Sequence, residues 1–146
     1  MTVLTDEATI RQLVAGRTAA MRTGDAEAIC GTYTPDAVIF SLAPPLVQPA
    51  NGARDVNQMQ TWFHEKGGSV WSQVRDLQVT VDGDLALCTS LESMGASPDS
   101  PHPFTLWFRS TLGLRRLDGE WRIIHEHAST PFHMDGSFRA ATDLQP

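Results

Sequence analysis

The sequence predicts an α+β domain in which three N-terminal helices pack on one face of a curved antiparallel sheet. Three observations lead to this fold class. Apolar side chains recur at helical spacing through much of residues 6–65, and long runs rich in β-branched and aromatic residues fill residues 70–129. Asp-Gly dipeptides, which are among the strongest hairpin signals, join two pairs of these runs.

Capping residues and turns mark the individual elements. Thr5 is a favourable N-cap for a first helix, whose apolar stripe ends at Gly24. Asp25 caps a short second helix that we expect to continue through Tyr33. The remaining elements predicted from periodicity are a short strand at 36–42, a helix at 54–65, and strands at 70–81, 85–96, 104–117 and 121–129.

Length and composition describe one domain. A chain of 146 residues with 41% apolar side chains can bury an ordinary core, so residues 1–146 are taken as a single domain. Three prolines within residues 97–103 predict a loop between two of the strands. Residues 133–146 have no apolar periodicity, and we expect them to form a flexible polar tail.

The charge pattern excludes several partners. The net charge is −6, from 11 Lys and Arg against 17 Asp and Glu, and there is no basic stripe of the kind that binds nucleic acid. Neither a signal peptide nor an apolar run of membrane-spanning length is found, which predicts a cytoplasmic protein without a membrane partner.

Cys30 and Cys88 lack metal-binding spacing and are expected to be small buried side chains. Because no phosphate-binding glycine loop or nucleophile elbow occurs, we expect no cofactor.

The last predicted hairpin carries polar groups at depths where a core strand would place apolar ones. A two-residue turn at Asp118-Gly119 pairs Leu117 with Glu120, and therefore Thr111 with Glu126 and Arg109 with Ala128. Strict alternation then gives one face to Arg109, Thr111, Ile124, Glu126 and Ala128, and the other to Trp121, Ile123, His125 and His127. A β-bulge near the turn would reverse this pairing.

An ordered set of short motifs resembles the nuclear transport factor 2-like (NTF2-like) superfamily, and most closely its SnoaL-like branch of ketosteroid isomerase homologues. The motifs are residues 24–29, 33–38, 82–86, 118–121 and 125–132, together with Gly52. The resemblance implies a cone-shaped fold with a pocket between the helices and the concave sheet face. It also implies that the face of Glu126 lines this pocket and that the histidines lie on the convex face, a common dimer interface in the superfamily.

The catalytic residues of the ketosteroid isomerases are absent. By the resemblance, their oxyanion-hole tyrosine falls at Arg17, their general-base aspartate at Ser41 and their protonated aspartic acid at Thr111. Steroid isomerisation by that mechanism needs a carboxylate base and a neutral acid donor. We therefore reject it for this chain.

Two interpretations of the polar face stay open. In the first, Glu126 is a general acid or base, with Arg109, helped by Arg17, as the oxyanion stabiliser. In the second, Arg109 and Glu126 form a structural ion pair. The expected ligand contacts are Arg17, Ser41, Trp62, Thr111, Ile124 and Ala128.

The two histidines offer a different chemistry. His125 and His127 are alternative acid/base groups if the pairing of the strands is reversed. A metal site would need a third ligand, for which His133, Glu92 and Glu126 are only loose candidates, so none is expected.

The function expected from these features is a cofactor-independent isomerase, cyclase or lyase acting on a hydrophobic carbonyl compound. The alternatives are a non-catalytic binding module for a small acidic or neutral molecule, or a dimeric assembly module. In each case we expect a homodimer through the convex sheet face, where Trp121, Ile123 and the two histidines would form an apolar patch.

Overall fold

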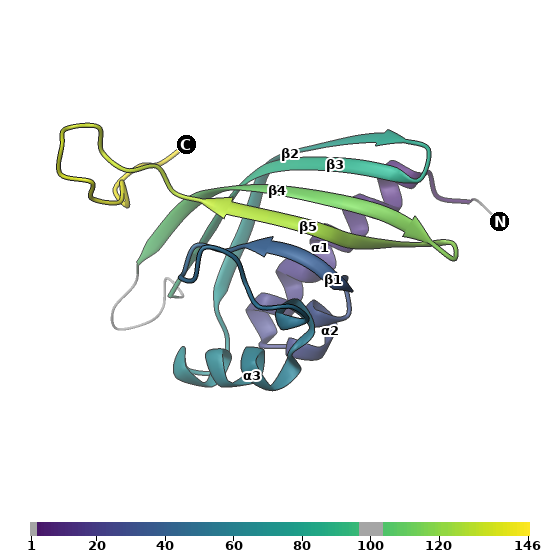
Figure 1. The fold of residues 1–146 in the computed structure, drawn as a ribbon, viewed down its shortest axis with the longest axis horizontal. Coiled ribbons are helices and arrows are strands. Elements are labelled where there is room, and N and C mark those ends of the chain that lie inside the picture. The colour runs from purple at the N-terminus through teal and green to yellow at the C-terminus, as the bar shows by residue number, and fades with distance from the viewer. Residues whose placement is uncertain (1–2, 97–103) are drawn as a thin grey trace.

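The computed structural model describes residues 3–96 and 104–146 (Figure 1). The predicted loop at residues 97–103 lies outside the described residues. The elements are α1 (Asp6–Thr23), α2 (Ala26–Cys30), β1 (Tyr33–Phe40), a 3-10 turn η1 (Gly52–Arg54), α3 (Val56–Glu65), β2 (Trp71–Asp82), β3 (Leu85–Gly95), β4 (Thr105–Leu117) and β5 (Glu120–Ser129).

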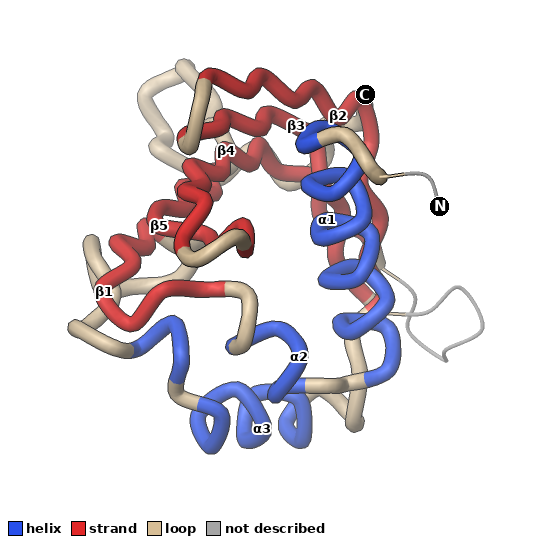
Figure 2. The backbone as a smooth tube through the Cα atoms, turned by 90° about the vertical axis from the view of Figure 1, so that its right-hand side faces the viewer, coloured by secondary structure: helices blue, strands red, loops and turns tan. Residues whose placement is uncertain are grey.

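In the described part of the chain, a five-stranded sheet in the order β1-β5-β4-β3-β2 forms the body of the fold. Strands β2 to β5 are an antiparallel meander, as predicted, whereas β1 pairs with β5 in parallel. Figure 2 shows that the sheet curls and that all three helices lie on its concave side. The α+β fold class expected from the sequence is confirmed.

Local signals place both ends of α1 where the sequence predicts them. The Thr5 hydroxyl accepts from the Ala8 N–H at 3.1 Å, and Gly24 ends α1 in the left-handed conformation with φ 71°. A Cβ at Gly24 would collide with the carbonyl oxygen of Gly68, so this close approach of backbones also requires glycine. The second helix is shorter than predicted, because Tyr33 already begins β1.

The core lies between α1 and the concave face of the sheet. Ile10 and Val14 of α1 are buried, as are Leu114 of β4 and Ile123 of β5. Trp121 is also buried, and its indole N–H donates to Asp6 Oδ1 at 3.1 Å. The expectation that Trp121 and Ile123 lie on the convex face was wrong, since both belong to the core.

A β-bulge changes the predicted pairing of β4 with β5. Next to the turn Leu117 pairs with Glu120, as predicted, but the register shifts between Gly113 and Leu114 because Ile124 is an extra residue on β5. Beyond the bulge the partners are Leu112 and Glu126, Thr111 and His127, and Arg109 and Ser129. One inserted residue reverses the alternation of a strand, so the predicted pairs Thr111–Glu126 and Arg109–Ala128 are wrong.

The segment after β5 folds back on itself. Phe132 pairs with Ala140 in an isolated antiparallel bridge, and the His133 N–H donates to the Arg139 carbonyl at 2.8 Å. Ala141 is buried, whereas Phe138 remains exposed. The tail expected from the sequence thus has local structure in the described chain. No helix among the described residues has the length and apolarity to span a membrane.

Candidate active site

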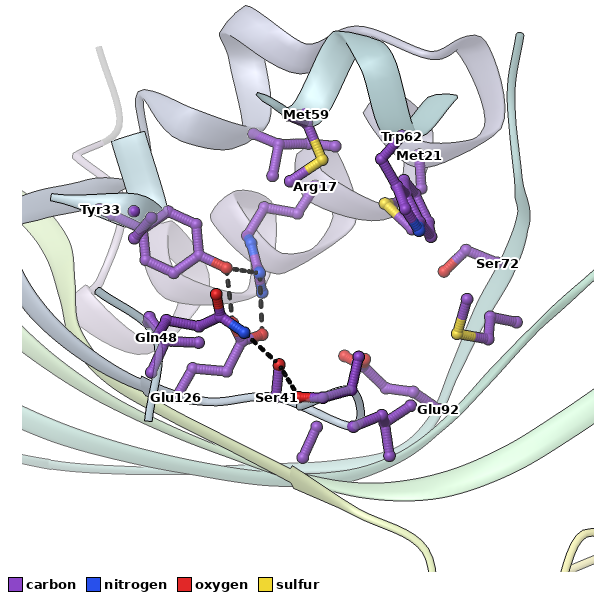
Figure 3. Close-up of a pocket in the computed structure, with 18 of the residues that line it drawn as sticks. Arg17, Met21, Tyr33, Ser41, Gln48, Met59, Trp62, Ser72, Glu92 and Glu126 are labelled. Carbon is purple, nitrogen blue, oxygen red and sulfur yellow. Dashed lines mark hydrogen bonds and ion pairs between the residues drawn. The ribbon is translucent and has the colours of Figure 1, made fainter. Parts of the chain in front are cut away.

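A cavity of about 460 Å³ opens between the helices and the concave face of the sheet (Figure 3). Helices α1 and α3, the loop after β1, and the inward side chains of β3, β4 and β5 enclose it. Most of the surface is apolar. The apolar side chains that line it include Val14, Met21, Ile29, Ile39, Met59, Trp62, Met94, Phe108 and Ala128.

Arg17, Tyr33 and Glu126 form a hydrogen-bonded cluster at one side of this pocket (Figure 3). Arg17 Nη2 donates to Tyr33 Oη at 2.6 Å and to Glu126 Oε1 at 3.1 Å. The Tyr33 hydroxyl in turn donates to Glu126 Oε2 at 2.6 Å. Both carboxylate oxygens of Glu126 therefore accept a hydrogen bond, and the ion pair leaves only 13% of the Arg17 side chain and 16% of the Glu126 side chain exposed.

Three separate elements bring this cluster together. Arg17 lies on the apolar stripe of α1, Tyr33 is the first residue of β1, and Glu126 follows the bulge in β5. Since Glu126 is paired with Ile39 of β1 and Leu112 of β4, its side chain lies on the inward face with theirs.

Burial and neighbouring charges fix the protonation states of Tyr33 and Arg17. Burial raises the pKa of Tyr33 well above its usual value, so the hydroxyl stays neutral at physiological pH. Burial by itself would lower the pKa of Arg17, but Tyr33 and Glu126 outweigh it and hold that pKa above its usual value. Arg17 is therefore a permanent cation. Its Nε is buried without a hydrogen-bond partner among the described residues.

Glu92 is a second carboxyl group of the pocket, and it contrasts with Glu126. It lies on β3 between Val74 of β2 and Phe108 of β4, and none of the described residues makes a hydrogen bond to it. Burial raises the pKa of Glu92 from 4.5 to about 7; Arg17 opposes this rise and the negative charge of Glu126 adds to it. Both the acid and the carboxylate are thus populated near neutral pH.

The loop after β1 forms one wall of the pocket. The Gln48 backbone N–H donates to the Ile39 carbonyl at 3.0 Å, and its Nε2 donates to Ser41 Oγ at 2.7 Å. Ser41 Oγ donates onward to the Ala43 carbonyl at 3.0 Å. The Ser41 hydroxyl consequently holds the loop in place in this structure.

The structure brings together some of the site residues named from the sequence. Arg17, Ser41, Trp62, Glu126 and Ala128 all line the pocket. The expectation that Arg109, Thr111 and Ile124 share this lining was wrong, because the bulge at Ile124 reverses the alternation of β5 relative to β4.

The sequence interpretation paired Arg109 with Glu126, and this was wrong. Arg109 is an exposed residue, and the cation that pairs with Glu126 is Arg17. Arg17 belongs to α1 and not to the neighbouring strand β4. The packing of α1 against the sheet brings it to Glu126, and the residue pattern of the hairpin carries no information on that packing.

Neither histidine of the His-Glu-His segment lines the pocket. His125 Nδ1 lies 2.7 Å from the Val38 carbonyl oxygen, and the rings of His125 and His127 pack edge-on against Phe40. Among residues 3–96 and 104–146, no group of three or more His, Cys, Asp or Glu side chains is arranged to hold a metal ion.

Glu92 is the residue that the sequence interpretation missed as a pocket group, having named it only as a loose metal candidate. The sequence signal was mixed. The expectation that Cys88 is buried extends by alternation to Glu92. The more apolar positions of the strand, however, alternate onto the opposite face; they are Leu85, Leu87 and Leu91. The structure buries Ala86 and Cys88, and thereby turns Glu92 inward.

Comparison with known proteins agrees with the fold. The family model described as a SnoaL-like domain matches residues 10–133. The structure is similar to an NTF2-like protein of unknown function from Pseudomonas putida, at 31% identity and a TM-score of 0.83, covering 99% of this chain and 100% of that one. An NTF2-like protein with a cystatin-like fold from Novosphingobium aromaticivorans is similar at 20% identity and a TM-score of 0.69, covering 97% of this chain and 90% of that one.

No curated protein matches the sequence. The family match nevertheless spans most of the chain, and the first structural relative extends over its full length. The chain therefore belongs to the SnoaL-like domain family of NTF2-like proteins.

Proposed function

We propose that this protein binds a hydrophobic carbonyl compound and catalyses a cofactor-independent proton transfer on it, as an isomerase, cyclase or lyase does. The observation that carries the proposal is Glu92, a carboxyl group that faces a mostly apolar pocket without a hydrogen-bond partner among the described residues. A carboxyl group with a pKa near the working pH is suited to both accept and return a proton.

The proton transfer assigns separate roles to Glu92 and Arg17. The Glu92 carboxylate removes a proton from the carbon beside the carbonyl group, and the electrons of that C–H bond form an enolate. The enolate oxygen takes the negative charge, which the Arg17 cation stabilises. Glu92 then returns the proton to the same or a conjugated carbon, or to a leaving group.

Glu126 becomes a positioning residue in this proposal, instead of the acid/base group considered from the sequence. Its two oxygens already accept hydrogen bonds from Arg17 and Tyr33, so taking up a proton would break one of these bonds. Its role is to hold Arg17 at the pocket.

The experiment is hydrogen–deuterium exchange at the α-carbon of a hydrophobic ketone. The protein is incubated with 1-tetralone in D₂O, and deuterium uptake by the ketone is followed by mass spectrometry. The native protein should accelerate uptake over buffer, and Glu92→Gln should lower the rate by about 100-fold, in line with the usual contribution of a general base. Glu65→Gln, an equivalent change at an exposed position of α3, is the matched control and should leave the rate unchanged.

A non-catalytic binding module is the second candidate. The Arg17–Tyr33–Glu126 cluster favours it, because a buried ion pair that is also hydrogen-bonded to a hydroxyl can serve structure alone. Binding of 1-tetralone without any exchange above buffer would support this alternative and overturn catalysis.

The homodimer remains a proposal, but its basis changes because Trp121 and Ile123 are buried. The convex face carries a row of directly paired residues across four strands: Leu87, Gly113, His125 and Val38. Leu87 is 49% exposed and Val38 46%. We propose this row as the centre of the contact between two copies.

A further inference from the structure

We infer that the pocket selects uncharged ligands and rejects carboxylates, an inference that rests on the proposed function of the same pocket. The sequence left open whether the ligand is acidic or neutral. The distribution of charge around the cavity decides between these two classes.

The lining carries more acids than bases. Among the described residues around the cavity, Arg17 is the single cation, whereas Glu92 and Glu126 are acidic; Asp55 is acidic as well, but it is an exposed residue whose carboxylate caps α3. Without Asp55, the net charge of the lining is −1 when Glu92 is ionised and 0 when Glu92 is protonated. Where Glu92 is ionised, a carboxylate ligand would therefore enter a site that is already negative.

Arg17 does not offset the charge that such a ligand adds. Enolate formation only moves a negative charge from Glu92 to the ligand and leaves the net charge of the pocket unchanged, whereas a bound carboxylate brings a further negative charge. The Arg17 guanidinium lies 3.1 Å from the Glu126 carboxylate, so its charge is already paired. A ligand carboxylate at Arg17 would come next to Glu126, and two carboxylates close together repel each other and disfavour joint ionisation. Burying a charge without a cation of its own is costly in a cavity of low polarity.

Arg109 and Arg22 do not supply a second cation to the pocket. Arg109 is exposed beyond the bulge and does not line the cavity. Arg22 follows Arg17 on α1, but its Nε donates to the Ser72 carbonyl at 2.6 Å and its guanidinium lies over the Trp71 ring at 4.2 Å. Neither can serve as a second cation for a bound acid.

The rest of the lining fits an uncharged ring system. Met21, Met59 and Met94 present flexible thioether side chains, and Trp62 and Phe108 present aromatic surface. Figure 3 shows Met59 and Trp62 on the helix side of the pocket and Glu92 on the sheet side. Methionine adapts to ligands of different outline, and aromatic rings pack on planar apolar surfaces. The ligand class is thus a ring-containing, uncharged compound with a carbonyl or hydroxyl oxygen.

A matched pair of probes tests this inference. 2-Acetonaphthone and 2-naphthoate share one ring system and differ in having a ketone or a carboxylate. Their affinities are measured by isothermal titration calorimetry at about pH 8, where Glu92 is mostly ionised. We expect the ketone to bind about 10-fold more tightly than the acid, or better, because only the acid brings an uncompensated charge.

Two variants show whether the pocket charge is the cause. Glu92→Gln removes one negative charge and should strengthen naphthoate binding, so that the ratio of the two affinities falls. Glu65→Gln removes the same charge from an exposed position outside the pocket and should leave the ratio unchanged. Far-UV circular dichroism checks that both variants are folded.

The outcomes separate this inference from the proposed function. If naphthoate binds as tightly as acetonaphthone, or if Glu92→Gln leaves the ratio unchanged, selection against carboxylates is overturned while ketone binding stands. If neither probe binds the native protein, the proposed pocket function is overturned as well. Tighter binding of the ketone, with a ratio that falls only in Glu92→Gln, supports the inference.

Discussion

Arg17 and Glu126 are 109 positions apart in the sequence, yet Arg17 Nη2 lies 3.1 Å from Glu126 Oε1 in the wall of the pocket. Their ion pair joins the first helix to the last strand. Tyr33 contacts both partners, so three elements meet at this point. The pair makes the pocket polar at this side without giving it a net positive charge.

Replacing Arg17 by Met should destabilise the protein, because it leaves the Glu126 carboxylate buried without its cation. We expect a loss of about 3–5 kcal/mol in the free energy of unfolding, the usual cost of breaking a buried ion pair. Urea denaturation measures it. The double variant Arg17→Met with Glu126→Gln should recover part of the loss; a single variant as stable as the native protein would contradict a buried ion pair.

Glu92 should make stability fall as the pH rises. Its pKa is raised in the fold from 4.5 to about 7, so the folded state keeps a proton that the unfolded chain releases between these values. The contribution is fully present below about pH 4.5 and is lost as the pH rises through about 7. Relative to Glu92→Gln, the native protein should lose up to about 3 kcal/mol across this window. Urea denaturation of both proteins at a series of pH values measures the difference, and a constant difference would rule the shift out.

The pH profile of α-deuteration should report the charge of Glu126. With Glu92 as the base, the exchange rate rises with pH through the pKa of Glu92. Glu126→Gln removes a negative charge that raises this pKa and leaves Arg17 unpaired, and both effects lower it. The midpoint of the profile should therefore move to lower pH. An unchanged midpoint would mean that Glu126 has only a structural role.

Two glycines of the N-terminal region should respond in opposite directions to alanine. Gly24 has φ 71° and no room for a Cβ beside Gly68, so Gly24→Ala should destabilise by about 1–3 kcal/mol. Gly16 lies inside α1 with nothing near its missing Cβ, so Gly16→Ala should stabilise by about 0.5–1 kcal/mol. Thermal unfolding compares the two variants. Equal effects would contradict the described end of α1.

The proposed contact between two copies predicts a change of oligomeric state. Leu87→Glu places a charge in the middle of the paired row on the convex face and should convert the dimer to a monomer. Asp82→Asn, at an exposed turn-flanking position, is the control and should leave the dimer intact. Light scattering coupled to size-exclusion chromatography measures both, and a monomeric native protein would overturn the proposal.

The sequence by itself determined the features that depend on neighbouring residues. Thr5 and Asp25 cap helices through their own side chains, and Gly24 ends the first helix because few other residues adopt its backbone conformation. The turn at Asp118-Gly119 joins β4 and β5 as predicted. These signals, with the periodicity of apolar residues, were sufficient for the α+β fold class and for the elements in nearly their observed bounds.

Only the tertiary structure decided which polar groups share the pocket. The bulge at Ile124 has no marker in the local pattern, yet it reverses the face of every residue beyond it and takes Arg109 and Thr111 away from Glu126. Glu126 forms its ion pair with Arg17 because the packing of α1 against the curled sheet brings the two side chains together. The environment of Glu92 has the same origin: its raised pKa comes from burial and from charges on other elements. Local interactions are encoded within a few residues, whereas these contacts join segments that meet only once the whole chain has folded.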